Sequence, residues 1–163
     1  MASIVVRRAT PEDAGTVAEL NTFVQGLHAR LIPEIFKPAS AETSGVSEMR
    51  AILSAPEHFG LLATLDGTPV GYVLAEVRRK PERSHARASS EVYVHHMSVA
   101  SAYRRQGVGS ALLDAVTAEA QALGIERLAL EVWDANAEAA AFYAARGFAV
   151  ERVRMSRGGW GVA

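Results

Sequence analysis

The segment Arg104-Arg-Gln-Gly-Val-Gly-Ser110 combines two arginines with two closely spaced glycines, directly after an apolar stretch that ends at Val99. Glycine lets backbone N–H groups come close to an anion, because no Cβ stands in the way. A helix that opens at these glycines also presents unpaired N–H groups and the positive end of its dipole. Arg104 and Arg105 add two positive charges. The segment therefore predicts a binding cradle for a pyrophosphate group.

Three phosphate-binding patterns compete for this segment. A Walker loop requires a lysine after the second glycine, and Gly109 is followed by Ser110 and an alanine. The dinucleotide fingerprint requires a third glycine where Leu112 stands. The remaining pattern, Arg/Gln-x-x-Gly-x-Gly/Ala, is met by Arg104, Gly107 and Gly109. The alternative without a ligand is a glycine-containing turn between a strand and an ordinary helix.

Polar side chains gather on the strand predicted just before this loop. Side chains alternate along a strand, which predicts one face with Glu91, Tyr93, His95, Met97 and Val99 and another with His96 and Ser98. An imidazole with its ordinary pKa of about 6.5 is suited to proton transfer near neutral pH. The candidate general bases on this strand are therefore Glu91, Tyr93, His95 and His96, of which His95 is preferred, and His28 is a second candidate from the first predicted helix. A histidine that only forms hydrogen bonds within the sheet is the alternative.

The elements that must position these residues follow the order β-α-α-β-β-β-α-β-α-β. Strands are predicted over residues 4–8, 59–65, 70–77, 91–99, 128–133 and 148–155. The predicted helices run from a Thr10 cap to Leu31, from Ser47 to Leu53, from the glycine loop to Leu123, and from an Asp134 or Asn136 cap to near Gly147. An α/β fold, with one mixed sheet and helices on both faces, buries this order compactly.

Length and composition narrow the class of protein. The 163 residues fit a single domain, 1–163. A net charge of −1 argues against nucleic acid as the main partner, and the lack of cysteine excludes disulfides, thiolate metal sites and a cysteine acyl-enzyme. No apolar run approaches the roughly 18 residues of a membrane helix, and no secretion signal opens the chain. The expected compartment is the cytoplasm, without a membrane partner.

Three local matches, in this order, resemble the GNAT superfamily of N-acetyltransferases. They are Met97-Ser-Val99 with Arg104 to Ser110, then Val132-Trp-Asp-Ala-Asn136, and then Ala141-Phe-Tyr-Ala-Ala-Arg-Gly-Phe148. The resemblance spans essentially the whole chain and is strongest from Val92 to Phe148. It implies a single, mainly antiparallel mixed sheet flanked by helices, and it implies acetyl-CoA as co-substrate.

The resemblance also assigns roles to individual residues. The cofactor would contact Met97, Val99, Arg104, Arg105, Gln106, Gly107, Val108, Gly109, Ser110, Asn136 and Tyr143. Tyr143 would point its hydroxyl at the thioester sulfur, and His28, Phe36 and Tyr93 would shape the acceptor pocket. A helix cap is the alternative for Asn136, a packed aromatic for Tyr143, and a surface histidine for His28. Many family members carry a carboxylate at the position of His95, so a histidine there departs from the family pattern.

The expected activity is acetyl transfer to a primary amine of a small molecule or a protein. Because the chain has no cysteine, direct transfer in a ternary complex is the economical mechanism, and it requires no metal. A homodimer agrees with the family resemblance. Two other functions stay open: an acyl-CoA sensor that has lost the chemistry, and a nucleotide-phosphate protein, which stronger binding of ATP or NAD than of CoA would favour.

Overall fold

A five-stranded sheet forms the centre of the computed structural model, which describes residues 3–40, 43 and 45–158. The strands are β1 (Ile4–Ala9), β2 (His58–Leu65), β3 (Thr68–Lys80), β4 (Ser89–Val99) and β5 (Leu128–Leu130), in that spatial order. All neighbouring strands are antiparallel except β4 and β5. The mixed, mainly antiparallel sheet expected from the sequence is confirmed.

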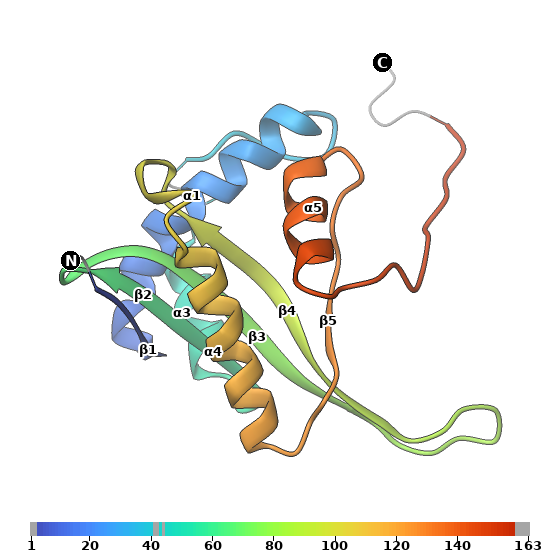
Figure 1. Cartoon of the computed structure of the whole chain (residues 1–163). Coiled ribbons are helices and arrows are strands. Elements are labelled where there is room, and N and C mark those ends of the chain that lie inside the picture. Colours follow the sequence, from blue (N-terminus) through green and yellow to red (C-terminus); the bar gives the residue numbers. More distant parts are fainter. Residues whose placement is uncertain (1–2, 41–42, 44, 159–163) are drawn as a thin grey trace.

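Helices cover both faces of this sheet (Figure 1). On one face α4 (Val108–Ala122) packs on the sheet through a stripe of buried side chains, Val108, Leu112, Val116 and Ala120. The opposite face is covered by α1 (Ala14–Leu31) and α3 (Val46–Ser54). A short helix, α5 (Ala137–Ala145), lies beside the start of α4. The two hydrophobic cores therefore lie on opposite faces of one sheet.

The connection from β4 through α4 to β5 places the glycine loop. A short 3₁₀ turn, Ser101–Tyr103, follows β4, and α4 begins five residues later. Because β4 and β5 are parallel, α4 crosses one face of the sheet between them. The glycine loop thus lies at the carboxyl end of β4, where open α/β sheets commonly bind ligands.

Two strand predictions in the last third of the chain are wrong. The strand predicted over 128–133 ends at Leu130, and residues 148–155 form no strand. The apolar side chains of this second segment, Val150, Val153 and Met155, are exposed. A strand needs a partner for its backbone groups, and β5 offers only three paired residues before it ends. The apolar pattern alone therefore did not show whether these residues form a strand.

None of the helices in the described part of the chain has both the length and the apolar character that a membrane crossing needs.

Candidate active site

The strands β4 and β5, the last two in the sheet order, separate after Val94. They pair only from Val92 to Val94, whereas β4 continues along β3 as far as Val99. The Ala100 amide donates to the Val70 carbonyl of β3, so alternation turns the backbone groups of Val99 and Met97 toward the other edge. No strand of the described residues pairs with that edge. It is an open edge that an extended, peptide-like ligand can pair with.

The glycine loop presents a row of free amides next to this edge. The first backbone hydrogen bond of α4 runs from the Ala111 amide to the Gly107 carbonyl, at 2.9 Å. Within the described residues, the amides from Arg105 to Ser110 donate to no other backbone group. Arg105 (φ 62°) and Gly107 (φ 87°) both adopt left-handed conformations, which turn successive amides in different directions. This arrangement can hold an anion, and pyrophosphate binding by the loop stays a prediction.

Two side chains of the loop instead support its own backbone. Arg104 donates from Nε to the Val99 carbonyl at 3.4 Å, and Gln106 donates to the Ala102 carbonyl at 3.0 Å. Among the residues that the structure describes, no side chain caps the start of α4 at Gly107. The structure therefore gives Arg104 and Gln106 a positioning role in the loop and leaves its amides open.

A β-bulge changes which side chains of β4 share a face. The pairing with β3 shifts between Leu74 and Ala75, which oppose His96 and Val94, so His95 is the extra residue. Val94 is part of the core under α4, whereas Ser98 donates to the Leu20 carbonyl of α1. The alternation therefore reverses across the bulge.

The predicted faces of β4 were consequently wrong. Met97 and Val99 pack with the core under α4. Tyr93 lies opposite Glu76, and its ring contacts the ring of His95 at 4.9 Å. The side chains of Tyr93, His95 and Glu76 lie on the other face of the sheet, toward α1. The prediction assumed strict alternation along the whole strand. One inserted residue moves every later side chain to the opposite face.

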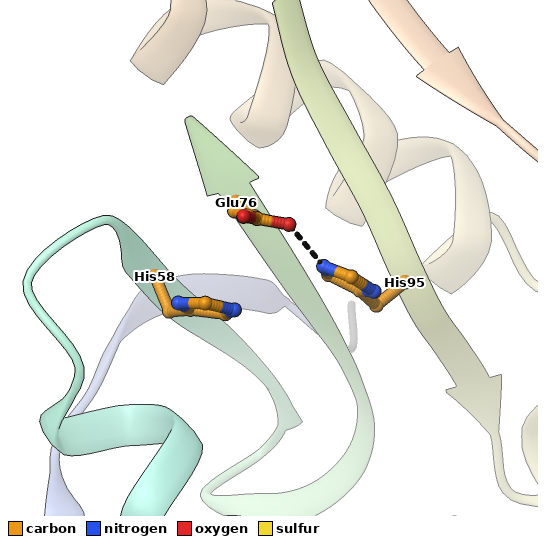
Figure 2. A group of neighbouring side chains, drawn as sticks. All are labelled: His58, Glu76 and His95. Carbon is orange, nitrogen blue, oxygen red and sulfur yellow. Dashed lines mark hydrogen bonds and ion pairs between the residues drawn. The ribbon is translucent and has the colours of Figure 1, made fainter. Parts of the chain in front are cut away.

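His95 forms a hydrogen bond with Glu76, a residue that no sequence motif marks. The distance between His95 Nε2 and Glu76 Oε2 is 2.8 Å, and Arg78 Nε donates to the same oxygen at 2.8 Å (Figure 2). Partial burial works to raise the pKa of Glu76, but the hydrogen bonds from Arg78 and His95 outweigh it and lower the pKa. Glu76 is thus a carboxylate that only accepts. Neutral His95 must carry its proton on Nε2, which leaves the lone pair on Nδ1.

Aromatic rings from three separate segments meet one another. The ring of His28, on α1, lies 4.9 Å from that of Phe36, and Phe36 meets Trp133 edge-on at 5.6 Å. Burial lowers the pKa of His28. Desolvation, with the nearby His95 as a second cause, lowers the pKa of His96. His28 and Phe36 therefore lie in contact, and Trp133 joins a group that sequence reasoning had not assigned to a pocket. That His28 and Phe36 bind the acceptor stays a prediction.

The two predicted residues after β5 take different positions. Asn136 caps α5, because its Oδ1 accepts from the Ala139 amide at 3.2 Å. Phe142 lies against Gly109, 3.5 Å from where a Cβ would stand, so α5 carries the neighbouring Tyr143 to the cradle end of α4. Burial raises the pKa of Tyr143 to about 12. Its phenol therefore stays protonated at neutral pH.

The fold recurs among solved structures, some of which are named as acetyltransferases. A tetramutant of the BH1408 protein from Bacillus halodurans has 24% identity and a TM-score of 0.89 over 94% of this chain and 99% of that one. The aminoglycoside N-acetyltransferase AAC(6')-Iy, solved with CoA, has 21% identity and a TM-score of 0.70 over 97% and 96%. A ribosomal-protein-alanine N-acetyltransferase from Brucella melitensis has 19% identity and a TM-score of 0.71 over 95% and 99%.

The sequence itself matches a family model as well. The model for the acetyltransferase (GNAT) family covers residues 25–148. That range contains the open edge of β4, the amide cradle, the aromatic group and α5. The chain belongs to the GNAT acetyltransferase family.

Proposed function

We propose that the protein transfers an acetyl group from acetyl-CoA to a primary amine, directly and in a ternary complex. The observation that carries this proposal is the continuity of the open β4 edge with the amide cradle. The edge suits the two amide groups of a pantetheine arm, and the cradle suits the pyrophosphate that follows it. CoA contains both chemical groups in one chain.

In this proposal each part of CoA has its own set of contacts. Met97 and Val99 offer backbone groups to the pantetheine arm. The pyrophosphate accepts from the amides between Arg105 and Ser110, with the positive end of the α4 dipole behind them. Asn136 already caps α5 with its side-chain oxygen, so its NH₂ group remains as the donor to the cofactor.

The chemistry requires a neutral amine, a polarised carbonyl and a stabilised leaving group. A free alkyl amine has a pKa of about 10.4 and is mostly protonated at pH 7. His95 Nδ1 accepts its proton, and Glu76 holds the opposite ring nitrogen. As the C–N bond forms, a backbone N–H at the open edge stabilises the carbonyl oxygen. The C–S bond then breaks and Tyr143 donates its phenolic hydrogen to the sulfur. The second proton of the amine, which leaves the nitrogen as the amide forms, returns to the Tyr143 oxygen and restores the phenol.

The acceptor enters from the α1 side in this arrangement. His28, Phe36 and Trp133 form one wall, and Tyr93 lies beside the base. An aromatic wall suits an amine attached to an apolar or planar group, because such a group can stack on it. Two of the similar structures are named for aminoglycosides and ribosomal-protein alanine. Both acceptors present primary amines.

Turnover with a panel of amines tests this function. Purified protein with acetyl-CoA and small amines, aminoglycosides or peptides should release free thiol and acetylated amine in equal amounts. The matched control omits the amine. Tight CoA binding with no turnover on any acceptor would contradict the proposal and would favour an acyl-CoA sensor.

The cradle makes a separate prediction at Gly107. Its φ of 87° is strained for any residue with a Cβ. Gly107→Ala should therefore change the loop conformation and weaken CoA binding by at least about tenfold. That loss reduces the stabilisation that saturating ligand gives the native state. Thermal denaturation with and without CoA measures the change.

Gly124 provides the matched control for this variant. It has a φ of 69° and lies just beyond the other end of α4, where an added Cβ would meet no atom within 4 Å. Gly124→Ala imposes similar backbone strain, so its unliganded melting temperature should fall by a similar amount. Its shift on CoA addition should equal that of the wild type. If CoA raised the melting temperature of both variants by the same amount, the assignment of the glycine loop as the pyrophosphate site would be wrong.

A further inference from the structure

We propose that His58, Glu76 and His95 form a binding site for one divalent transition-metal ion, with Zn²⁺ as the leading candidate. The three residues come from the adjacent strands β2, β3 and β4. One potential ligand atom from each lies within 4.8 Å of the other two. Figure 2 shows Glu76 with the two imidazole rings on either side of it, directed toward a shared space.

Backbone register brings the three side chains together. His58 lies opposite Glu76 in the β2–β3 ladder, and residues that lie directly opposite share a face. The bulge in β4 turns His95 to that same face and brings it to Glu76. The rings of His58 and His95 are stacked at 5.6 Å with an interplanar angle of 18°. Secondary structure, rather than flexible loops, therefore positions the ligands.

His58 supplies an independent observation. Its Nδ1 is buried and has no hydrogen-bond partner among the described residues. A buried polar atom without a partner is rare and calls for a compensating interaction, which a bound ion can provide. Ligand atoms at about 2.1 Å around a tetrahedral ion lie about 3.4 Å apart. A movement of about 1 Å, which the exposed His95 ring permits, converts the present spacing into that geometry.

The charges around the group select the class of metal. Arg78 donates to Glu76 Oε2 and lies over the ring of Tyr93, 3.6 Å from its centroid. This guanidinium offsets the negative charge of the site, so hard ions such as Mg²⁺ and Ca²⁺, which depend on several carboxylates, bind poorly. Two imidazoles and one carboxylate suit Zn²⁺, Co²⁺ or Ni²⁺. Arg78 then acts as the partner that orients the carboxylate.

A metal ion on His95 would prevent this ring from accepting the proton of the amine. With the ion on Nε2, the single proton of the neutral ring moves to Nδ1. Nδ1 then has no lone pair for the amine proton. The ion thus acts as an inhibitor at a site that does not overlap the CoA cradle. This consequence rests on the proposed function, whereas metal binding itself does not.

Zn²⁺ titration of the untagged, chelator-treated protein tests the site by calorimetry. We expect one ion per chain. Co²⁺ should give the visible absorption of a low-coordinate N/O site. His58→Ala and Glu76→Gln should each weaken Zn²⁺ binding by at least about 10–100-fold, a loss seen even for outer partners of metal ligands. His85→Ala, which removes an exposed histidine of the β3–β4 hairpin, is the matched control and should bind normally.

The outcomes separate the two proposals. No binding by wild type, or unchanged affinity in both His58→Ala and Glu76→Gln, overturns the metal site. The Co²⁺ spectrum of the wild type decides the question even if a variant fails to fold. Zn²⁺ should also inhibit acetyl transfer over the concentration range in which it binds, and His58→Ala should lose that sensitivity. Metal binding by a protein that transfers no acetyl group would refute only the proposed function.

Discussion

Replacement of His95 by alanine is expected to lower kcat by about 10²–10⁴-fold, the usual contribution of a general base. Neutral His95 holds a proton on Nε2 toward Glu76, so its Nδ1 is the nitrogen that can accept the amine proton. Protonation at low pH removes that lone pair. The wild-type rate should therefore fall on the acidic side of the pH–rate profile. His95→Ala should be slow throughout and should lack this limb.

Two variants make the test of His95 specific. His96→Ala removes the neighbouring imidazole on the same face and should keep the acidic limb. Glu76→Gln keeps a side chain of the same size but removes the carboxylate, so His95 loses the partner that fixes its tautomer. That variant should lower kcat less than His95→Ala does. All measurements are made with a chelator present. An unchanged acidic limb in His95→Ala would assign the proton transfer to another residue or to water.

Tyr143→Phe is expected to lower kcat by about 10²–10³-fold, the cost of removing one donor to developing negative charge. CoA affinity should stay the same, because only the phenolic hydroxyl is lost. A change confined to KM would instead indicate a binding or packing role. Since the pKa of Tyr143 is raised to about 12, its ionisation should cause no loss of wild-type rate up to about pH 11. Steady-state kinetics across pH measure both effects.

Tyr72→Phe is the matched control for this substitution. Its hydroxyl donates to Asn21 Oδ1 at 2.8 Å in the core under α1. Loss of that buried hydrogen bond should lower the free energy of unfolding by about 1–3 kcal/mol, because Asn21 loses its partner. Catalysis should be unaffected. If Tyr143→Phe lost stability but kept full activity, Tyr143 would be a packed aromatic.

The parts of the fold that depend on neighbouring residues could be predicted from the sequence. Gly107 marks the start of α4 because few other residues adopt a left-handed φ, and the structure confirms that conformation. The Asp66–Gly67 turn between β2 and β3 likewise has positive φ at both residues. The β4–α4–β5 unit follows from the same local signals.

Features that depend on pairing between distant strands could not be predicted in this way. The bulge at His95 arises from a register shift against Leu74 and Ala75, and nothing in the spacing of β4 marks it. Glu76 and His58 lie 19 and 37 positions from His95, and only the sheet brings them together. A glutamate or histidine on a half-buried strand carries no local signal of such a cluster.

The open edge of β4 has a consequence for the unliganded chain. A row of unpaired backbone groups accepts any extended peptide, including a strand from a neighbouring molecule, and is therefore an aggregation hazard. Here the exposed row is short, since it spans only residues 95–99. In the proposed complex a cofactor occupies it. The cofactor would then serve the colloidal stability of the protein as well as its chemistry, as a removable substitute for the missing strand.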